Sequence, residues 1–191
     1  GVQIVFDNQV ILGTRARKTR TKSFNAFSSI DYPETAMFRD RRLIQFLQRP
    51  AEYTHAVFST ALDPNVFVLR LVPGMRADII PLLEGRYRAL VLESFGVGGL
   101  PGGDDGAMFA AVRDWCGAGH LAVFTTQEQH EGSDPAEDEV GRAAKALPGV
   151  LEAHDMTPEA TAVKLMWVLG QTTDRAEAEK LFLTPVQWDI L

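Results

Sequence analysis

The period of the hydrophobic pattern changes about a third of the way along the chain, near residue 66. Before that point, Gln3–Phe6 and Val10–Leu12 are short apolar runs joined by Asp-Asn-Gln, which predicts a β-hairpin because Asp and Asn tolerate the left-handed backbone of a tight turn. The basic residues that follow, and the polar stretch Ser28–Glu34, predict loop. A short helix is predicted over Arg41–Gln48, ending before Pro50.

After residue 66, strand and helix patterns alternate. Apolar runs predict four buried strands, at Val66–Val72, Tyr87–Glu93, His120–Thr126 and Gly149–Leu151. Helical segments are predicted at Ala77–Leu83, at the stretch that places Met108, Phe109, Val112, Trp115 and Cys116 on one face, and at Glu137–Ala146, Pro158–Leu169 and Arg175–Phe182. This alternation predicts an α/β fold, a parallel sheet in a three-layer α/β/α arrangement, with a ligand crevice at the carboxyl ends of the strands.

Composition narrows the class of protein. The 191 residues are 46% hydrophobic and 23% charged, which excludes disorder as a global description. A formal charge of −6 argues against nucleic acid or an anionic membrane as partner. The stretch from Arg15 to Lys22 does carry five positive charges in eight positions, but we expect it to be a solvated surface or an oligomer contact. The single cysteine and the absence of a long apolar run lead us to expect a cytoplasmic protein.

The loop after the second strand, Glu93 to Gly103, is rich in glycine. A dinucleotide-binding reading fails, because Pro101 stands where G-x-G-x-x-G needs its last glycine, and because Asp104 and Asp105 already place negative charge at the helix N-terminus. Two alternatives stay open and carry equal weight: a turn shaped by packing alone, and a loop that approaches a ligand closely.

The loop after the third strand, Thr125 to Gly132, gathers hydroxyls, amides and carboxylates at the same sheet edge. Together these groups could hold an amino acid, although by residue type a solvated acidic loop is the favoured alternative. Other chemistries find less support. The four histidines lack metal-ligand spacing, no G-x-S-x-G elbow presents a serine, and Cys116 lies on the apolar face of its helix, where a thiol is inert. We therefore expect no metal and no cofactor.

The segment DMTPEATAVKLMWVLG, from Asp155 to Gly170, predicts a buried helix with Thr157 as N-cap and Pro158 in its first turn. As a string it closely resembles the C-terminal helix of the bacterial-type L-asparaginases, the cytoplasmic type I group in particular. Four further stretches resemble that family in the same order: Gly13-x-Arg15-x-x-Lys18, Phe24-x-Ala26-Phe27-x-Ser29, Pro73-Gly74-Met75 and Glu93-Ser94-Phe95-Gly96-Val97-Gly98.

The resemblance implies two units: residues 1–50 as the C-terminal remnant of the family's N-terminal domain with a linker, and residues 51–191 as its C-terminal α/β domain. It also implies a reaction, the hydrolysis of L-asparagine to L-aspartate and ammonia through attack by an activated threonine on the side-chain amide. The family's T-G-G-T-I and G-T-D-T motifs are not in this sequence. No catalytic residue is therefore assigned to this chain, which is expected to be inactive alone.

The resemblance further implies which residues adjoin substrate or an effector. The loop set is Ser94, Gly96, Gly98, Gly99, Thr126, Gln127 and Glu128. Gly99 stands where relatives have an Asn that completes a neighbouring subunit's site, and Glu128 stands where regulated relatives have a Cys. A carboxylate there would repel an amino-acid carboxylate. The motif residues expected to be structural are Arg15, Lys18, Asp155, Thr157, Glu159 and Lys164.

Three functions remain in competition. The first is the C-terminal part of an L-asparaginase that binds asparagine or aspartate, forms a homo-oligomer and pairs with the missing N-terminal region. The second is the asparaginase-like subunit of a tRNA-dependent amidotransferase, whose helix carries nearly the same motif. The third is a non-catalytic α/β domain that dimerises or binds a small amino acid.

Overall fold

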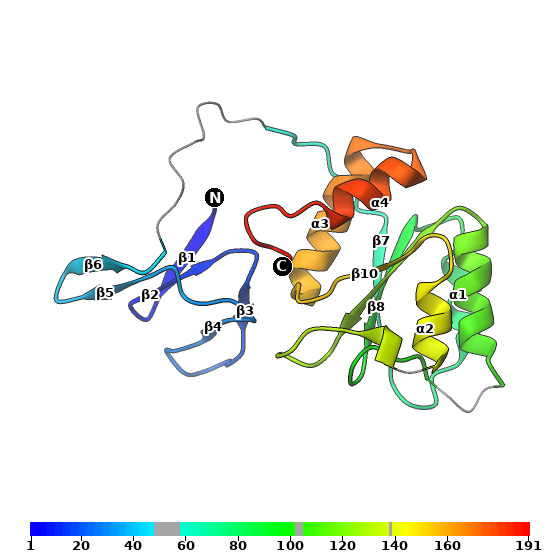
Figure 1. Ribbon diagram of the computed structural model, residues 1–191, viewed down its shortest axis with the longest axis horizontal. Coiled ribbons are helices and arrows are strands. Elements are labelled where there is room, and N and C mark those ends of the chain that lie inside the picture. Colours follow the sequence, from blue (N-terminus) through cyan, green and yellow to red (C-terminus); the bar gives the residue numbers. More distant parts are fainter. Residues whose placement is uncertain (48–57, 102–104, 138) are drawn as a thin grey trace.

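The computed structural model of the chain describes residues 1–47, 58–101, 105–137 and 139–191. Figure 1 shows a small group of strands from the first 47 residues beside an α/β unit built from the rest. The first group holds an antiparallel sheet in the order β1-β2-β5-β6 and a separate pair, β3 and β4. These strands are β1 (Gln3–Phe6), β2 (Gln9–Leu12), β3 (Ala16–Lys18), β4 (Phe27–Ser29), β5 (Ala36–Arg39) and β6 (Arg42–Gln45).

The hairpin expected at the start of the chain is formed by β1 and β2, which pair antiparallel around Asp7 and Asn8 at φ 48° and 62°. The helix predicted over Arg41–Gln48 is wrong, because β6 pairs antiparallel with β5 around a second left-handed turn, Asp40 and Arg41 at φ 50° and 62°. Such a turn matches the twist of a hairpin, and strand pairing then overrides local helix propensity.

Two further predictions from the sequence concern the N-terminal strands and the segment that follows them. The stretch expected to be loop contains β3 and β4, which pair antiparallel with Lys18 opposite Phe27. The unit boundary expected between residues 50 and 51 falls within 48–57, outside the described residues.

The α/β unit has a parallel sheet in the order β10-β9-β8-β7, which confirms the predicted fold class. Its strands are β7 (Val66–Arg70), β8 (Ala89–Ser94), β9 (Leu121–Thr126) and β10 (Val150–Glu152). Every residue of β8 and β9 is buried. A strand buried on both faces is the reason these runs are continuously apolar rather than alternating.

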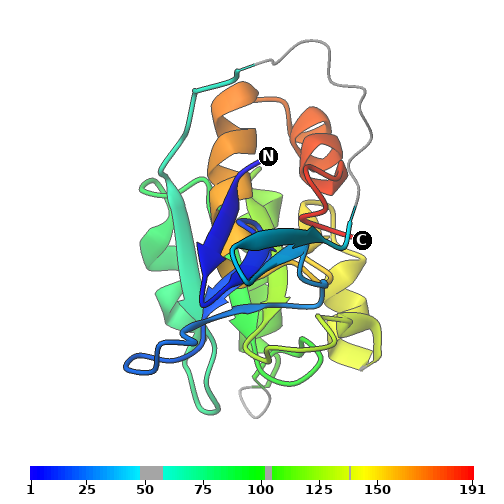
Figure 2. The same ribbon diagram turned by 90° about the vertical axis from the view of Figure 1, so that its left-hand side faces the viewer.

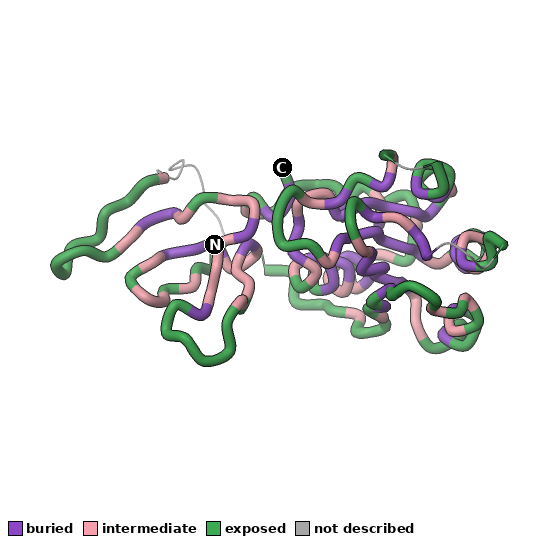
Figure 3. Tube along the Cα trace, turned by 90° about the horizontal axis from the view of Figure 1, so that it is seen from below, coloured by how far each residue is buried: buried purple, intermediate pink, exposed green. Residues whose placement is uncertain are grey.

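Helices cover both faces of this sheet (Figure 1). Alternate residues of β8 separate the two cores: Leu90 and Leu92 pack with α1 (Ala107–Gly117) and α2 (Glu139–Lys145), whereas Ala89 and Val91 pack with α3 (Pro158–Gln171) and α4 (Arg175–Leu183). Figure 3 shows the buried residues concentrated in this unit, while the β5–β6 hairpin is largely exposed. No helix in the described ranges is both long and apolar enough to cross a membrane.

The helix expected over Ala77–Leu83 is instead two 3-10 turns, η1 (Ala77–Ile79) and η2 (Pro81–Leu83). Pro81 lacks the N–H that a continuous helix would need at that point. A third 3-10 turn, η3 (Pro135–Glu137), precedes α2, which begins later than predicted and ends at Lys145. Elsewhere the predicted segments and the observed helices differ only at their ends.

The C-terminal segment and the start of α3 join the two parts of the molecule. The guanidinium of Arg15 is fully buried and pairs with Asp155 Oδ2 at 2.8 Å, while its Nε donates to the Trp188 carbonyl at 2.6 Å. The Arg15 guanidinium also lies 5.4 Å from the Tyr32 ring centroid. Figure 2 shows the N-terminal strands lying across the start of α3 and the C-terminal segment. One buried cation therefore holds β3 against the α/β unit.

Candidate functional site

The carboxyl ends of β8 and β9 bring the two predicted loops together. Ser94 is opposite Thr126 in the parallel register, and the Thr126 hydroxyl donates to the Gly96 carbonyl at 2.6 Å. The Gly96 N–H in turn donates to Glu128 Oε1 at 3.4 Å. The loops are thus fixed to each other at the sheet edge where an open parallel sheet places its ligand crevice.

Gln127 cross-links the strand ends behind this edge. Its side-chain nitrogen donates to the Leu71 carbonyl at 2.6 Å and to the Glu93 carbonyl at 2.9 Å, and its backbone N–H donates to the Ser94 carbonyl at 2.7 Å. These bonds hold the ends of β7 and β8 against the loop after β9. Because the side-chain nitrogen of Gln127 already donates to two carbonyls, it is not free to donate to a ligand.

The glycine loop is shaped in part by packing. Gly98 has φ 123° and is buried, and a Cβ there would meet Pro135 Cδ at 3.4 Å. The Asp134 N–H donates to the Val97 carbonyl at 2.7 Å, which holds the segment before α2 against the loop. Gly96 also has a positive φ, 59°, but nothing lies within 4 Å of the position of a Cβ there. Gly98 therefore fits the alternative of a turn shaped by packing. Gly96 is exposed and Gly99 is half-buried, so packing constrains them less.

Two buried hydroxyls near this edge have no hydrogen-bond partner among the described residues: Ser94 Oγ and Thr125 Oγ1, both at 0% exposure. Adjacent residues of a strand point to opposite faces, so Thr125 lies on the same face as its register partner Glu93, and Ser94 on the other face. A buried polar atom left unpaired costs free energy, so these two hydroxyls are unsatisfied polar groups beneath this sheet edge.

A chain of four charges borders the face that carries Thr125. Glu93, 7% exposed, lies 3.5 Å from Arg70 Nη1 and 3.9 Å from Arg17 Nη2, measured to its Oε1. Arg17 Nε also lies 3.4 Å from Glu159 Oε1 on α3. These contacts join β7, β8, β3 and α3 in one polar network. Sequence reasoning placed Glu159 in a structural motif and missed Arg17 and Arg70, because their partners are distant in the chain.

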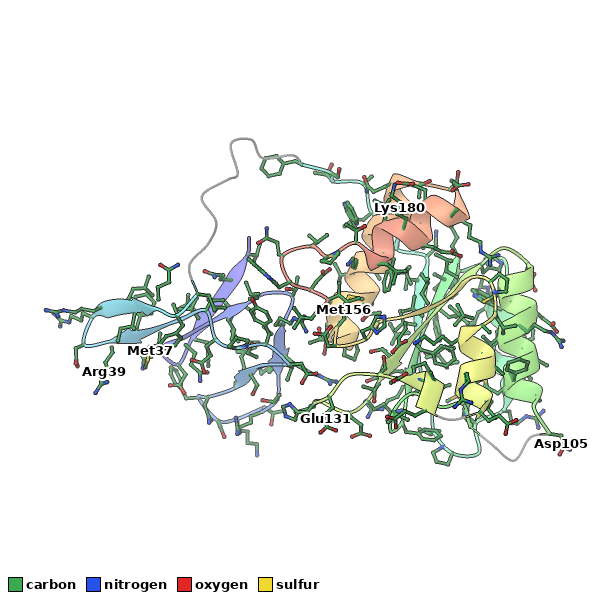
Figure 4. The ribbon with its side chains drawn as sticks, viewed as in Figure 1. Met37, Arg39, Asp105, Glu131, Met156 and Lys180 are labelled. Atoms are coloured by element: carbon green, nitrogen blue, oxygen red, sulfur yellow. The ribbon has the colours of Figure 1, made fainter. Side chains whose placement is uncertain are left out.

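The loop after β9 also reaches the N-terminal strands. The Glu131 N–H donates to Asp31 Oδ1 at 3.2 Å, and His130 Nδ1 lies 3.8 Å from the same oxygen. Figure 4 shows Glu131 at the tip of this loop, between the N-terminal strands and the parallel sheet. The acidic loop is consequently held at both ends, by Gly96 and by Asp31.

Apart from Glu159, which Arg17 links to Glu93, the motif residues lie away from these two loops. Thr157 caps α3 by accepting from the Ala160 N–H at 3.1 Å, and its hydroxyl contacts the Thr14 carbonyl at 3.4 Å. Lys164 is buried, 2.9 Å from Asp189 Oδ2, whereas Lys18 is exposed at the end of β3. The Arg15–Asp155 pair, the Thr157–Thr14 contact and the Lys164–Asp189 pair together connect the N-terminal strands, α3 and the C-terminal segment.

Cys116 does not belong to the site. It is buried in the core near the end of α1, and burial raises the pKa of its thiol to about 11. A neutral thiol is a poor nucleophile at ordinary pH. Among the described residues no three His, Cys, Asp or Glu side chains are grouped as a metal site would require.

The fold and this edge define an α/β protein with polar loops at the carboxyl ends of two neighbouring strands of an open parallel sheet. A family model described as the glutaminase/asparaginase C-terminal domain matches residues 65–182, and one described as the N-terminal asparaginase domain matches residues 1–52. The chain belongs to the asparaginase family.

Two curated relatives illustrate the family. An L-asparaginase of Thermococcus kodakarensis is 37% identical over 182 residues, 95% of this chain and 54% of that protein. A glutamyl-tRNA(Gln) amidotransferase subunit of Metallosphaera sedula is 32% identical over 178 residues, 90% of this chain and 39% of that protein. The chain thus spans about half or less of the length of these two relatives.

Solved structures agree on the fold. The thermostable L-asparaginase from Thermococcus kodakarensis superposes with a TM-score of 0.92 at 34% identity, covering 100% of this chain and 57% of that one. L-asparaginase I from Vibrio cholerae gives a TM-score of 0.84 at 22% identity, again covering 100% of this chain and 57% of that one, a likeness that concerns the fold alone.

Proposed function

We propose that the chain is the C-terminal part of an L-asparaginase, which hydrolyses L-asparagine to L-aspartate and ammonia. The observation that carries the proposal is the 37% identity to an L-asparaginase over 95% of the chain, with both family domains matched in order. The expected role of this part is to complete the active site and to oligomerise. The subtype, cytoplasmic type I, is part of the same proposal.

An activity assay tests this proposal. The chain alone is expected to release no ammonia from asparagine, because the nucleophilic threonine of the family motif is not in its sequence. Mixed with the part of the Thermococcus kodakarensis enzyme that it does not cover, it should gain asparaginase activity. Turnover by the chain alone at the rate of a complete relative would contradict the expected inactivity, and no activity in any reconstituted mixture would count against the proposed function.

The crevice loops are the proposed contact with an amino acid, with Glu128 selecting against free amino-acid carboxylates. Glu93 is flanked by Arg17 and Arg70, whereas Glu128 makes no ion pair within the described part of the chain and is exposed. Glu128 is therefore the carboxylate that most disfavours a second anion, by about 1 to 4 kcal/mol at contact distance.

Calorimetry can measure this selection. Glu128→Cys should strengthen asparagine binding, and Glu131→Gln, on the same loop but bonded through its backbone to Asp31, is the matched control. Glu93→Arg would place a third guanidinium beside Arg17 and Arg70, so we expect no further gain from adding it. Tight asparagine binding by the unmodified chain, or equal binding by the Glu128→Cys and Glu131→Gln variants, would refute the assignment.

The amidotransferase subunit is the second candidate, favoured by 32% identity to the Metallosphaera sedula protein. It is the weaker candidate because both the identity and the share of the relative covered are lower than for the L-asparaginase. Binding of tRNA by the reconstituted assembly would favour it over the asparaginase proposal. A non-catalytic amino-acid-binding or dimerisation domain would be favoured by asparagine binding or dimerisation with no activity in any reconstituted mixture.

A further inference from the structure

A small cavity of about 210 Å³ lies in the α/β unit at the amino ends of its parallel strands. Arg88 comes just before β8 and His120 just before β9, and both line the cavity together with the start of α4. The crevice loops follow the other ends of these six-residue strands, about 20 Å away. In Figure 1, α4 lies at the top of the α/β unit, whereas the loop between β9 and α2 lies at the bottom. The cavity is therefore separate from the candidate site.

The guanidinium of Arg88 is one of two that line the cavity. Its Nη1 donates to Asp63 Oδ2 at 2.7 Å and to the Leu169 carbonyl at 3.1 Å. Its Nε and Nη2 have no hydrogen-bond partner in the described part of the chain, and Asp63 is not one of the residues that line the cavity. Arg88 therefore brings unused N–H groups to this space without a facing carboxylate of its own.

The second guanidinium, that of Arg175, is held in place by the backbone around it. Its Nε donates to Glu179 Oε1 at 3.0 Å and its Nη1 to the Cys116 carbonyl at 3.4 Å. A Cβ at Gly149 would lie 2.9 Å from its Nη2, so the absence of a side chain there leaves room for the guanidinium. The Nη2 group has no hydrogen-bond partner among the described residues, and Glu179 lies outside the cavity lining.

Uncharged donors line the same cavity. The imidazole of His120 stacks on the Trp115 ring, with centroids 4.2 Å apart, and the structure gives its ring nitrogens no hydrogen bond to a described residue. The Thr173 hydroxyl is likewise unpaired within the described ranges. Asp174 is the one carboxylate among the lining residues, and its Oδ1 accepts from the Glu177 N–H at 2.8 Å as the N-cap of α4. The groups left unused are thus mainly hydrogen-bond donors.

We infer that this cavity binds a small tetrahedral oxyanion of the phosphate class, either the free anion or the phosphate group of a small ester. Guanidinium N–H groups make strong charge-assisted bonds to phosphate oxygens, and an imidazole and a hydroxyl add further donors. The volume of about 210 Å³ accommodates one such anion with several waters, each of which takes about 30 Å³. The inference does not depend on the proposed function, because every lining residue lies away from the crevice loops.

Calorimetry on the 191-residue chain tests the inference, with inorganic phosphate as probe and sodium chloride at the same ionic strength as reference. Phosphate should bind one to one. Arg175→Gln should weaken binding about tenfold or more, because a charge-assisted contact is lost. Arg113→Gln is the matched control: Arg113 is an exposed arginine of α1 outside the cavity, paired with its neighbour Asp114, and its replacement should leave the affinity unchanged.

A second variant and a second measurement keep the test decisive if Arg175→Gln does not fold. His120→Phe keeps a ring that stacks on Trp115 but removes both ring nitrogens, so it should weaken phosphate binding by about threefold to tenfold. In amide NMR spectra, phosphate should shift the signals of Gly119 and Thr173 and leave that of Gly96 unmoved.

Glycerol 3-phosphate distinguishes the two sources of the anion. Tighter binding than inorganic phosphate supports an ester as the ligand, and equal or weaker binding supports the free anion. The inference is overturned if phosphate gives no binding beyond chloride, or if Arg113→Gln weakens binding as much as Arg175→Gln. It is also overturned if asparagine displaces the phosphate, which would place the anion at the crevice loops, or if L-aspartate binds in the cavity more tightly than phosphate.

Discussion

Replacing Lys164 by Met should destabilise the protein strongly, because it breaks a buried ion pair. Lys164 Nζ lies 2.9 Å from Asp189 Oδ2 and donates to the Thr184 carbonyl at 2.9 Å, and the two charged side chains are 5% and 4% exposed. The ammonium also lies 5.6 Å from the Phe182 ring centroid. Removing one partner of a buried pair leaves the other charge uncompensated.

The expected cost follows from that burial. Breaking a buried pair costs about 3 to 5 kcal/mol. For a chain of this size each kcal/mol lowers the melting temperature by about 2 to 4 °C, so Lys164→Met should lower it by about 6 to 20 °C. Asp189 keeps one hydrogen bond, from the Val186 N–H at 2.7 Å, which places the expected cost toward the lower end of this range.

Urea unfolding followed by circular dichroism measures the free energy of unfolding. Lys180→Met is the matched control, because Lys180 is 74% exposed and its pair with Glu177 is a surface pair worth well under about 1 kcal/mol. The double change Lys164→Met with Asp189→Leu should recover much of the loss, since no charge is then left buried alone. A loss below about 1 kcal/mol for Lys164→Met, or strictly additive costs in the double variant, would refute the reasoning.

Three further predictions concern single groups. Thr157→Ala removes the side-chain acceptor for the Ala160 N–H and should lower the free energy of unfolding, measured in urea at neutral pH, by about 1 kcal/mol; an unchanged value would contradict the capping role. Burial raises the pKa of the Cys116 thiol to about 11, so iodoacetamide should label this thiol only after unfolding. The free energy of unfolding should fall as pH rises from 9 toward 11, because the thiol of the unfolded chain ionises first. Rapid labelling of the folded chain at about pH 8 would contradict this. Burial alone would raise the pKa of Asp63, but hydrogen bonds from the Asn65 backbone and from Arg88 lower this pKa overall. The resulting stabilisation is present above pH 3.8 and is lost as pH falls further. Asp63→Asn should therefore reduce the fall in the free energy of unfolding that is measured at acid pH.

The parallel sheet was predictable because its central strands, β8 and β9, are buried on both faces. Continuous apolar runs such as the one within Ala89–Ser94 leave only a few alternatives once helical patterns alternate with them. The two N-terminal hairpins differ in how far their sequences reveal them. Asp7 and Asn8 indicate a turn, whereas the Asp40-Arg41 turn adopts the same left-handed backbone without that signature. All four residues of β6 are exposed, so no apolar alternation marks it as a strand.

The sequence predicts the two loops of the candidate site but does not predict the ion pairs beside them. Strand order alone brings Gly96 and Thr126 together, because they follow adjacent parallel strands. The contacts of Arg17 with Glu93 and Glu159 depend instead on how β3 lies across the α/β unit, and nothing in the local sequence of a basic stretch specifies a partner so far along the chain. For the same reason the unpartnered hydroxyl of Thr125 could not be recognised before its neighbours were placed.

The buried guanidinium of Arg15 sets an order for folding during synthesis. Its partners, Asp155 and the carbonyl of Trp188, are translated long after Arg15 itself, which lies in the turn just before β3. The N-terminal strands therefore leave the ribosome before the groups that neutralise their central cation exist, and the two parts cannot lock together until the C-terminal segment has emerged. Nascent chains stalled before residue 155 should consequently leave these strands sensitive to protease, and release of the full segment should protect them.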